Sequence, residues 1–217
     1  MPLPPDWAVS TLPKVIFRLC QRRSAVTKQE VFQIIDKKAA YYLVAIPEGD
    51  IAVKGKALQE KYSRQYGIYR KPYPSLHLTV GILSFPLHFL EQLHLSLEKV
   101  IRPFLPLQLK STRESCFPDP HKSINLALER SASLTALSAV VIRTVAAAGF
   151  SAEPFDQWDY HISIVNCYYA SRAWSKAEYL EACRQLAKEN LCLEGYTRRL
   201  ELWDPDFPPL KVLARLV

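Results

Sequence analysis

Apolar residues from position 39 onward follow two different spacings, which alternate along the chain. The continuous apolar run "AYYLVAI" at 40–46 is typical of a buried strand. Apolar residues then recur at helical spacing over about 51–66, and Gly67 follows where helices tend to end. The next segments predict a strand at 75–83, an amphipathic helix within 85–105 and an alternating strand at 105–112.

The second half of the chain repeats this order of elements. An alternating strand is expected first, then an Ala-rich helix that ends at Gly149, then another strand and another helix. The expected ranges are 123–129, 131–149, 160–168 and about 175–190, followed by closing strands at 191–204 and 210–217.

The two halves are therefore interpreted as copies of one β-α-β-α-β unit, at approximately 39–115 and 121–217. Tyr41 precedes His77 by 36 positions, and Ser123 precedes His161 by 38. We predict an α+β fold of two intertwined lobes related by a pseudo-twofold axis, each a mainly antiparallel sheet with helices on its outer face, around a central cleft. Residues 1–38 lie outside the repeat and are predicted to form a basic, partly helical extension, with a helix at 27–38.

The two strands that contain His77 and His161 have nearly the same sequence motif. "HLTV" begins at His77, and "HISI" begins at His161. Residues two apart on a strand share a face, so His77 lies with Thr79 and His161 with Ser163, while the aliphatic residues between them face the core. A single match of this kind is unremarkable, but two matches at equivalent positions of a repeat indicate a shared polar site.

Two imidazoles and two hydroxyls suit phosphoryl chemistry. A neutral histidine can accept a proton while a charged one donates a proton, and hydroxyls can donate hydrogen bonds to phosphoryl oxygens. Water, or a ribose hydroxyl in the reverse direction, then attacks phosphorus. The sequence leaves open which histidine is the base. The other histidines, His88, His94 and His121, are expected to be surface or structural residues.

The paired motifs resemble those of the 2H phosphoesterase superfamily, which includes 2′-5′ RNA ligase-like proteins and RNA 2′,3′-cyclic phosphodiesterases. The resemblance covers about residues 39–217. It implies a metal-independent and cofactor-free site that hydrolyses 2′,3′-cyclic phosphates or 2′-5′ linkages in RNA or nucleotides. By position, His77 and His161 would be catalytic, and Thr79 and Ser163 would bind phosphate. The basic extension departs from the compact members and puts the substrate in doubt.

Two segments that precede the motifs offer aromatic and basic groups for substrate binding. Tyr69, Arg70, Lys71 and Tyr73 come before the first motif, and Phe155 and Trp158 before the second. The alternative for the tyrosines is packing on the neighbouring lobe, and Tyr160 is expected in the core. Asp156 and Asp159 could orient His161 or bind a metal, but no carboxylate has metal-ligand spacing with the histidines.

Charge and composition add limits on partners and location. The net charge is +7, of which residues 1–38 contribute +4 (seven Lys or Arg against three acidic residues). This suits an RNA or nucleotide partner, although a short basic patch is often only a solvated helix face. No apolar run reaches the roughly 20 residues of a membrane span. We expect a soluble, monomeric, cytoplasmic protein with no obligatory protein partner, and five cysteines that are buried free thiols.

Two other functions remain open at this stage. One is a non-catalytic RNA or nucleotide sensor that uses the same cleft. The other is a protein tethered to nucleic acid by its basic extension, in which case deletion of residues 1–38 would lower RNA affinity and its salt dependence but leave the turnover of small substrates intact.

Overall fold

The chain is described here by a computed structural model that covers residues 40–153, 159–204 and 211–217. The predicted extension at 1–38 lies outside these residues. The first repeat unit contains β1 (Ala40–Ala45), α2 (Asp50–Tyr66) and β3 (Leu78–Ser84). The second contains β5 (Ser123–Leu128), α4 (Ala132–Ala147) and β7 (His161–Val165). The strand, helix and strand order expected in each unit is confirmed.

The other predicted elements also form, with two differences. The expected helix at 85–105 is α3 (Leu90–Ile101) between two short 3-10 turns. The expected strand at 191–204 is two strands, β8 (Glu194–Thr197) and β9 (Leu200–Asp204), because each pairs with different neighbours. The remaining elements are β2 (Glu48–Gly49), β4 (Leu107–Phe117), β6 (Ser151–Ala152), α5 (Lys176–Leu186) and β10 (Lys211–Leu216).

All strand pairs in the described residues are antiparallel, and together they form one sheet. The order along it is β10-β9-β1-β3-β7-β5-β4-β8-β2, and β6 pairs with β3. At the centre, β3 and β7 are joined through one residue pair, Leu78 with Ile162. The sheet therefore has two halves, one on the β3 side and one on the β7 side. A second connection runs along β1–β2 and β8–β9, where the Ile46 amide donates to the Arg199 carbonyl.

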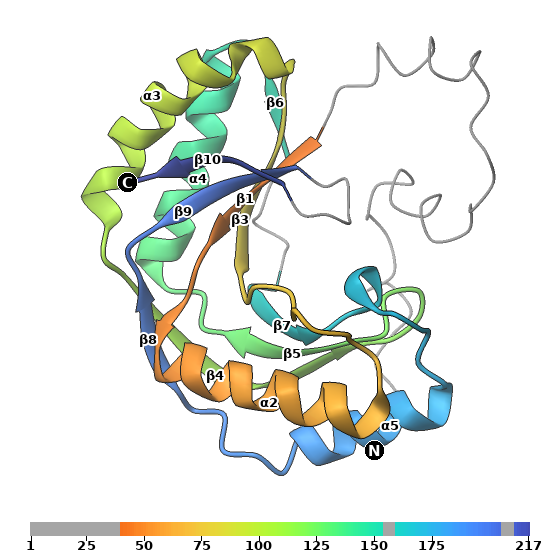
Figure 1. The fold of residues 1–217 in the computed structure, drawn as a ribbon. Helices are drawn as coiled ribbons and strands as arrows, with labels where there is room; N and C mark the ends of the chain where they lie inside the picture. The colour runs from red at the N-terminus through yellow and green to blue at the C-terminus, as the bar shows by residue number, and fades with distance from the viewer. Residues whose placement is uncertain (1–39, 154–158, 205–210) are drawn as a thin grey trace, which may run out of the picture. The chain divides into compact units, whose positions relative to one another are not determined.

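The helices between repeat strands cross to the opposite half of the sheet. Helix α2 leaves β1 and packs against β7, β8 and β4, whereas α4 leaves β5 and packs against β3 and β6 (Figure 1). Helix α5 joins α2 on the β7 side, and α3 joins α4 on the β3 side. The fold is therefore α+β with intertwined halves, as the repeat predicted. No helix within the described ranges is long and apolar enough to span a bilayer.

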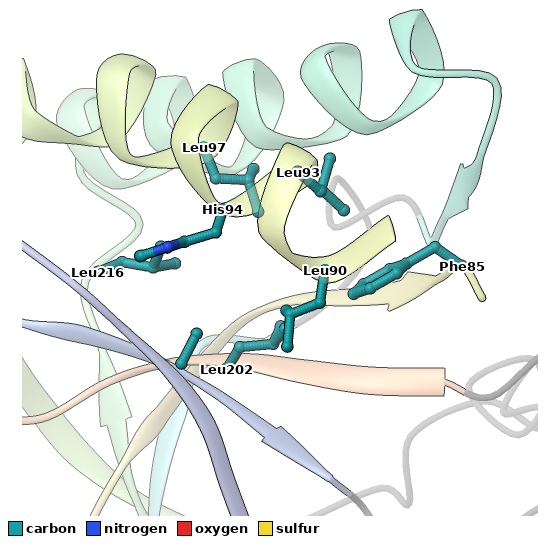
Figure 2. A pocket seen from close by; sticks show the side chains of 8 residues that line it. Phe85, Leu90, Leu93, His94, Leu97, Leu202 and Leu216 are labelled. Atoms are coloured by element: carbon teal, nitrogen blue, oxygen red, sulfur yellow. The ribbon is translucent and has the colours of Figure 1, made fainter. Parts of the chain in front are cut away.

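The contact between α3 and the strands β9 and β10 shows how the core of the β3 half is filled. Leu93 and Leu97 of the helix point toward Leu202 and Leu216 of the strands (Figure 2). The packing leaves no room for a water molecule between them. His94 lies at the rim and its Nε2 is 3.1 Å from the Arg215 carbonyl, which is the structural role expected for it.

The expectation that all cysteines are free thiols is wrong for two of them. Strand β4 and helix α5 bring the Cα atoms of Cys116 and Cys183 to 6.3 Å, and the two side chains form a disulfide. Cys167 is half-buried and Cys192 is exposed, so neither is fully buried as expected, and Cys20 lies outside the described residues. Sequence separation concealed the pairing because the partners are 67 positions apart.

The contact of β2 with β8 depends on a residue without a side chain. A Cβ at Gly195 would lie 2.5 Å from the Glu48 carbonyl oxygen and 3.1 Å from Ile51 Cβ.

Gly195→Ala is expected to lower the free energy of unfolding by about 1–3 kcal/mol, because backbone must move to admit the methyl group. Urea unfolding measures this loss. Gly67→Asn is the control, since Gly67 has φ 60 with no atom near its Cβ position, and should cost about 1 kcal/mol or less. Equal losses would contradict the steric explanation.

Candidate active site

The two histidine motifs lie side by side at the centre of the sheet. His161 opens β7, and His77 directly precedes β3. Leu78 and Ile162, the middle residues of the two motifs, form the central pair and are buried under the helices. The pseudo-twofold axis inferred from the repeat therefore passes between equivalent residues of the two motifs.

This register brings the four predicted polar residues together on one face. In an antiparallel pair, the neighbours of a matched pair are also matched, so His77 lies beside Ser163 and Thr79 beside His161. The two histidines occupy one diagonal of this arrangement, and the two hydroxyls occupy the other. The opposite face packs on the helices, since Ile164 lies against Gly55 of α2 and the Val80 carbonyl accepts a hydrogen bond from Ser138 of α4.

Both imidazole rings are held in the same way. Nδ1 of His77 lies 3.0 Å from the Ser75 carbonyl, and Nδ1 of His161 lies 2.8 Å from the Asp159 carbonyl. A carbonyl can only accept, so Nδ1 must carry the proton in each ring. Nε2 is therefore the atom that each ring has available for proton transfer, as an acceptor when the ring is neutral and a donor when it is charged.

An aromatic side chain contacts each histidine. The ring of His77 lies 4.5 Å from the ring of Trp203 on β9, and the ring of His161 lies 4.8 Å from that of Phe117 on β4, nearly perpendicular to it. Trp203 is itself fixed, because its Nε1 donates to the buried carboxylate of Glu201 at 2.8 Å. These contacts limit rotation of the imidazoles. Sequence reasoning missed both aromatic residues, because they lie on strands outside the motifs.

Burial lowers the pKa of both histidines below the usual value of 6.5. For His77 the pKa falls to about 4, because desolvation outweighs the hydrogen bond to Ser75 and the charge on His161 acts in the same direction as burial. For His161 burial also lowers the pKa, but the Asp159 carbonyl and carboxylate oppose this. His161 therefore has a carboxylate neighbour that favours its charged form.

The two hydroxyls differ in their partners. Ser163 Oγ donates to Oδ1 of Asn125 at 2.9 Å, and Asn125 is fully buried. Within the described part of the chain, the Thr79 hydroxyl has no hydrogen-bond partner. Sequence reasoning missed Asn125, although it is the one polar amide in the otherwise apolar centre of "SINLALE".

His121 lies closer to the site than expected. It lies in the turn between β4 and β5, is half-buried, and its Nδ1 is 3.3 Å from the Tyr168 hydroxyl. Its positive charge lowers the pKa of His161, and burial lowers its own pKa. The turn thus places Phe117 and His121 on the same side of the site, near His161.

Tyrosines add to the same face on the His77 side. Tyr42 of β1 is paired with Trp203, so the two side chains share a face. Burial, and then the charge of Glu153, raise the pKa of Tyr42. Burial and the nearby Tyr42 raise the pKa of Tyr169. No sequence pattern indicates this cluster, because its members come from separate elements.

The residues predicted to contact substrate before the first motif are placed differently from one another. Tyr69 is 7% exposed and its hydroxyl accepts the Asn166 amide at 2.7 Å, so it packs in the core, as the alternative reading had it. Arg70 and Lys71 are exposed, and the Lys71 ammonium lies 5.6 Å from the centre of the half-buried Tyr73 ring. The buried Tyr69 ring is therefore not placed to stack on a substrate base.

The segment before the second motif is only partly described. Phe155, Trp158 and Asp156 lie outside the described residues, and Asp159 is exposed. Tyr160 is in the core as predicted, with its hydroxyl 2.8 Å from Ser138 Oγ. The described residues include no group of three His, Cys, Asp or Glu side chains that could hold a metal ion.

Comparison with known proteins shows the fold. No family model matches the sequence, and no curated protein matches it either. LigT of Escherichia coli, solved in complex with 3′-AMP, is 14% identical with a TM-score of 0.53, covering 82% of this chain and 96% of LigT. A phosphoesterase is similar at 14% identity and a TM-score of 0.55, covering 82% and 97%. LigT in complex with NADP+ is 12% identical with a TM-score of 0.51, and the match covers 83% of this chain and 98% of LigT.

The chain thus has the fold of LigT and of this phosphoesterase, which is the α+β fold that the resemblance implied. At this identity the likeness establishes the fold alone. The placement of the two motifs at the centre of the sheet is an independent property of this chain.

The low pKa of His77 makes stability depend on pH. His77 binds a proton near pH 6.5 in the unfolded chain and near pH 4 in the folded protein. The folded state therefore loses stability as the pH falls from about 6.5 to about 4, and His77 causes no loss of stability above pH 6.5. Each unit of pKa difference corresponds to about 1.36 kcal/mol, so the loss in the free energy of unfolding is at most about 3 kcal/mol. The loss is smaller where water reaches the ring. His77→Asn removes this contribution and retains a donor toward Ser75.

Urea unfolding between pH 7 and 4 measures the effect. The stability of the wild type should fall more steeply than that of His77→Asn. His88→Asn, at an exposed histidine, is the matched control and should follow the wild type. Parallel curves for the wild type and His77→Asn would contradict the low pKa.

Proposed function

We propose that this protein is a phosphodiesterase that hydrolyses 2′,3′-cyclic phosphates, or 2′-5′ linkages, in RNA or nucleotides by acid–base catalysis with His77 and His161. The observation that carries the proposal is the symmetric pair of imidazoles. Both lie on one face of the central strands, and both have Nδ1 bound to a backbone carbonyl, which directs the chemistry to Nε2.

The diagonal arrangement suits an in-line displacement at phosphorus. The attacking and leaving oxygens of such a reaction lie on opposite sides of the phosphorus atom, and each needs its own proton-transfer group. Histidines at opposite corners meet this requirement. A hydroxyl at a remaining corner, that of Thr79, is available to donate to a non-bridging oxygen and stabilise the charge that develops there.

The substrate class rests on the groups around this centre. Half-buried Phe117 and Tyr42 supply aromatic surface near the histidines, and exposed Arg70 and Lys71 precede the first motif. LigT, which shares the fold, was solved in complex with 3′-AMP, a nucleotide with its phosphate on the ribose. Opening of a 2′,3′-cyclic phosphate gives a nucleotide of this kind. A cytoplasmic monomer that needs neither metal nor cofactor is part of the proposal.

The first experiment is a turnover assay. The four nucleoside 2′,3′-cyclic monophosphates and a short RNA with a cyclic phosphate end are incubated with the protein and a chelator, and phosphorus NMR identifies the product. We expect a single regioisomer, because a fixed acid can protonate only one ribose oxygen. Binding of these compounds by folded protein without turnover would favour the sensor alternative, and turnover lost to the chelator would contradict metal independence.

Variants at three of the motif residues should separate the roles. His77→Ala and His161→Ala should each lower kcat/KM by about 10²–10⁴-fold, the usual contribution of a general acid or base. Thr79→Val should cost about 10²–10³-fold if its hydroxyl stabilises the phosphoryl oxygen. Steady-state kinetics measure these losses, and circular dichroism verifies the fold. His88→Ala is the control at a distant, exposed histidine. Near-full activity of either motif-histidine variant would overturn the assignment.

A further inference from the structure

The two hydroxyls of the site have unlike neighbours, which breaks the symmetry of the repeat. On the β3 side, Thr79 is paired with Val44 of β1. On the β7 side, Ser163 is paired with Asn125 of β5. An apolar residue and an amide thus occupy corresponding places, and both are fully buried.

The contacts of Asn125 fix the direction of its hydrogen bond to Ser163. Its Nδ2 lies 3.0 Å from the Ser115 carbonyl and 3.4 Å from the Ser123 carbonyl. Carbonyls only accept, so this end of the side chain must be the NH₂ group. The oxygen therefore faces Ser163, and the single proton of the Ser163 hydroxyl is donated to it at 2.9 Å.

This bond changes what Ser163 can offer a substrate. Toward the site, Ser163 presents only lone pairs, which repel an anionic phosphoryl oxygen and attract the hydrogen of a water molecule. Turning the proton toward a phosphate would leave the buried oxygen of Asn125 without a donor, which is unfavourable. Thr79 has no such partner among the described residues, so its proton is free to be donated.

The register then assigns the two sides of the site. Ser163 lies between Asn125 on one neighbouring strand and His77 on the other. Nε2 of neutral His77 and the oxygen of Ser163 are two adjacent acceptors, which can hold both hydrogens of one water molecule. Thr79 lies beside His161, where a phosphoryl oxygen and the leaving group would be bound.

We propose that His77 is the general base and His161 the general acid, and that Asn125 is a positioning residue that makes Ser163 an acceptor for the attacking water. This inference rests on the proposed function. In the step, the water oxygen bonds to phosphorus while one of its protons passes to Nε2 of His77. The bond from phosphorus to the departing ribose oxygen breaks, and that oxygen takes the proton from Nε2 of His161. Proton exchange with solvent restores both rings.

The charges around the histidines agree with these roles. Burial and the charge of His121 lower the pKa of His161, while the carboxylate of Asp159 raises it. Burial and the charge of His161 lower the pKa of His77, and the Ser75 carbonyl opposes them. The charge on His161 further favours neutral His77. Asp159 thus favours the protonated ring that the acid requires at His161, and the charge of that ring favours a neutral His77 as the base.

Substrates with sulfur in place of a departing ribose oxygen test the assignment. A thiolate leaves without protonation, so it needs no general acid. We use nucleoside 2′,3′-cyclic phosphates with sulfur at the 2′ or the 3′ position, chosen by the regiochemistry of the wild-type product. His161→Ala should recover to within about tenfold of the wild type on the sulfur substrate, and His77→Ala should remain impaired by about 10²–10⁴-fold. The assignment would be overturned if the sulfur substrate restored activity to His77→Ala instead of His161→Ala, to both variants, or to neither.

A double-mutant cycle tests Asn125. Asn125→Val, which copies the residue at the corresponding place in the other half, should lower kcat by about 10–100-fold with little change in KM, and should cost nothing further when Ser163 is already Ala. Ser163→Thr should retain most activity. Ser123→Ala, which touches only the donor end of Asn125, is the control and should change kcat by less than about threefold. Equal losses in both backgrounds would make Asn125 merely structural and overturn its role.

A measurement without turnover keeps the inference separate from the proposed function. Absence of wild-type activity on all the cyclic phosphates would defeat the proposed function. The order of protonation can still be read from the imidazole ¹⁵N shifts of wild-type protein in the presence of 3′-AMP, with His77→Asn and His161→Asn used for assignment. His161 should bind its proton at higher pH than His77. The reverse order would overturn the assignment whether or not the protein is active, and it does not depend on folding of the Asn125 variant.

Discussion

One backbone pairing, between Leu78 and Ile162, determines the geometry of the candidate site. It is the only residue pair between β3 and β7 in the described residues, and it joins the two halves of the sheet at their centre. Because side chains alternate on a strand, this register places both histidines and both hydroxyls on one face. A shift by one residue would turn one motif into the core and bring its aliphatic residues to the site.

The packing under this pair explains why the register is held. Leu78 and Ile162 are buried, and so are Val80 and Ile164 two residues further along. Burial of each such side chain contributes roughly 1.5–3 kcal/mol, whereas a histidine on the same face would lose its solvation. The apolar residues of the motifs thus position the polar ones. The alternation of polar and aliphatic residues in the motif therefore indicates the site, whereas a single histidine would not.

The sequence was sufficient to predict the repeated elements and motifs. It was not sufficient to predict contacts between residues that lie far apart in the chain. The spacing of His77 and His161 from their preceding strands predicted the shared face, because it depends only on local alternation. Trp203 and Phe117 were missed because contact with the histidines depends on the order of strands in the sheet. For Tyr69 the sequence left substrate contact and packing on the neighbouring lobe both open, and the order of strands decides for burial. Asn125 was overlooked because its importance lies in which strand pairs with it and in the direction of one hydrogen bond.

The exchange of helices between the two halves bears on how a substrate can enter. Helix α2 connects two strands of the β3 half but packs on the β7 half, and α4 does the reverse. A hinge motion that opened the sheet between β3 and β7 would have to strip both helices from their apolar contacts at once. The spacing of the two histidines is therefore a rigid dimension of the molecule. For the proposed phosphodiesterase, this fixed span would select substrates by the fit of their phosphate, and any adjustment would have to come from the loops around it.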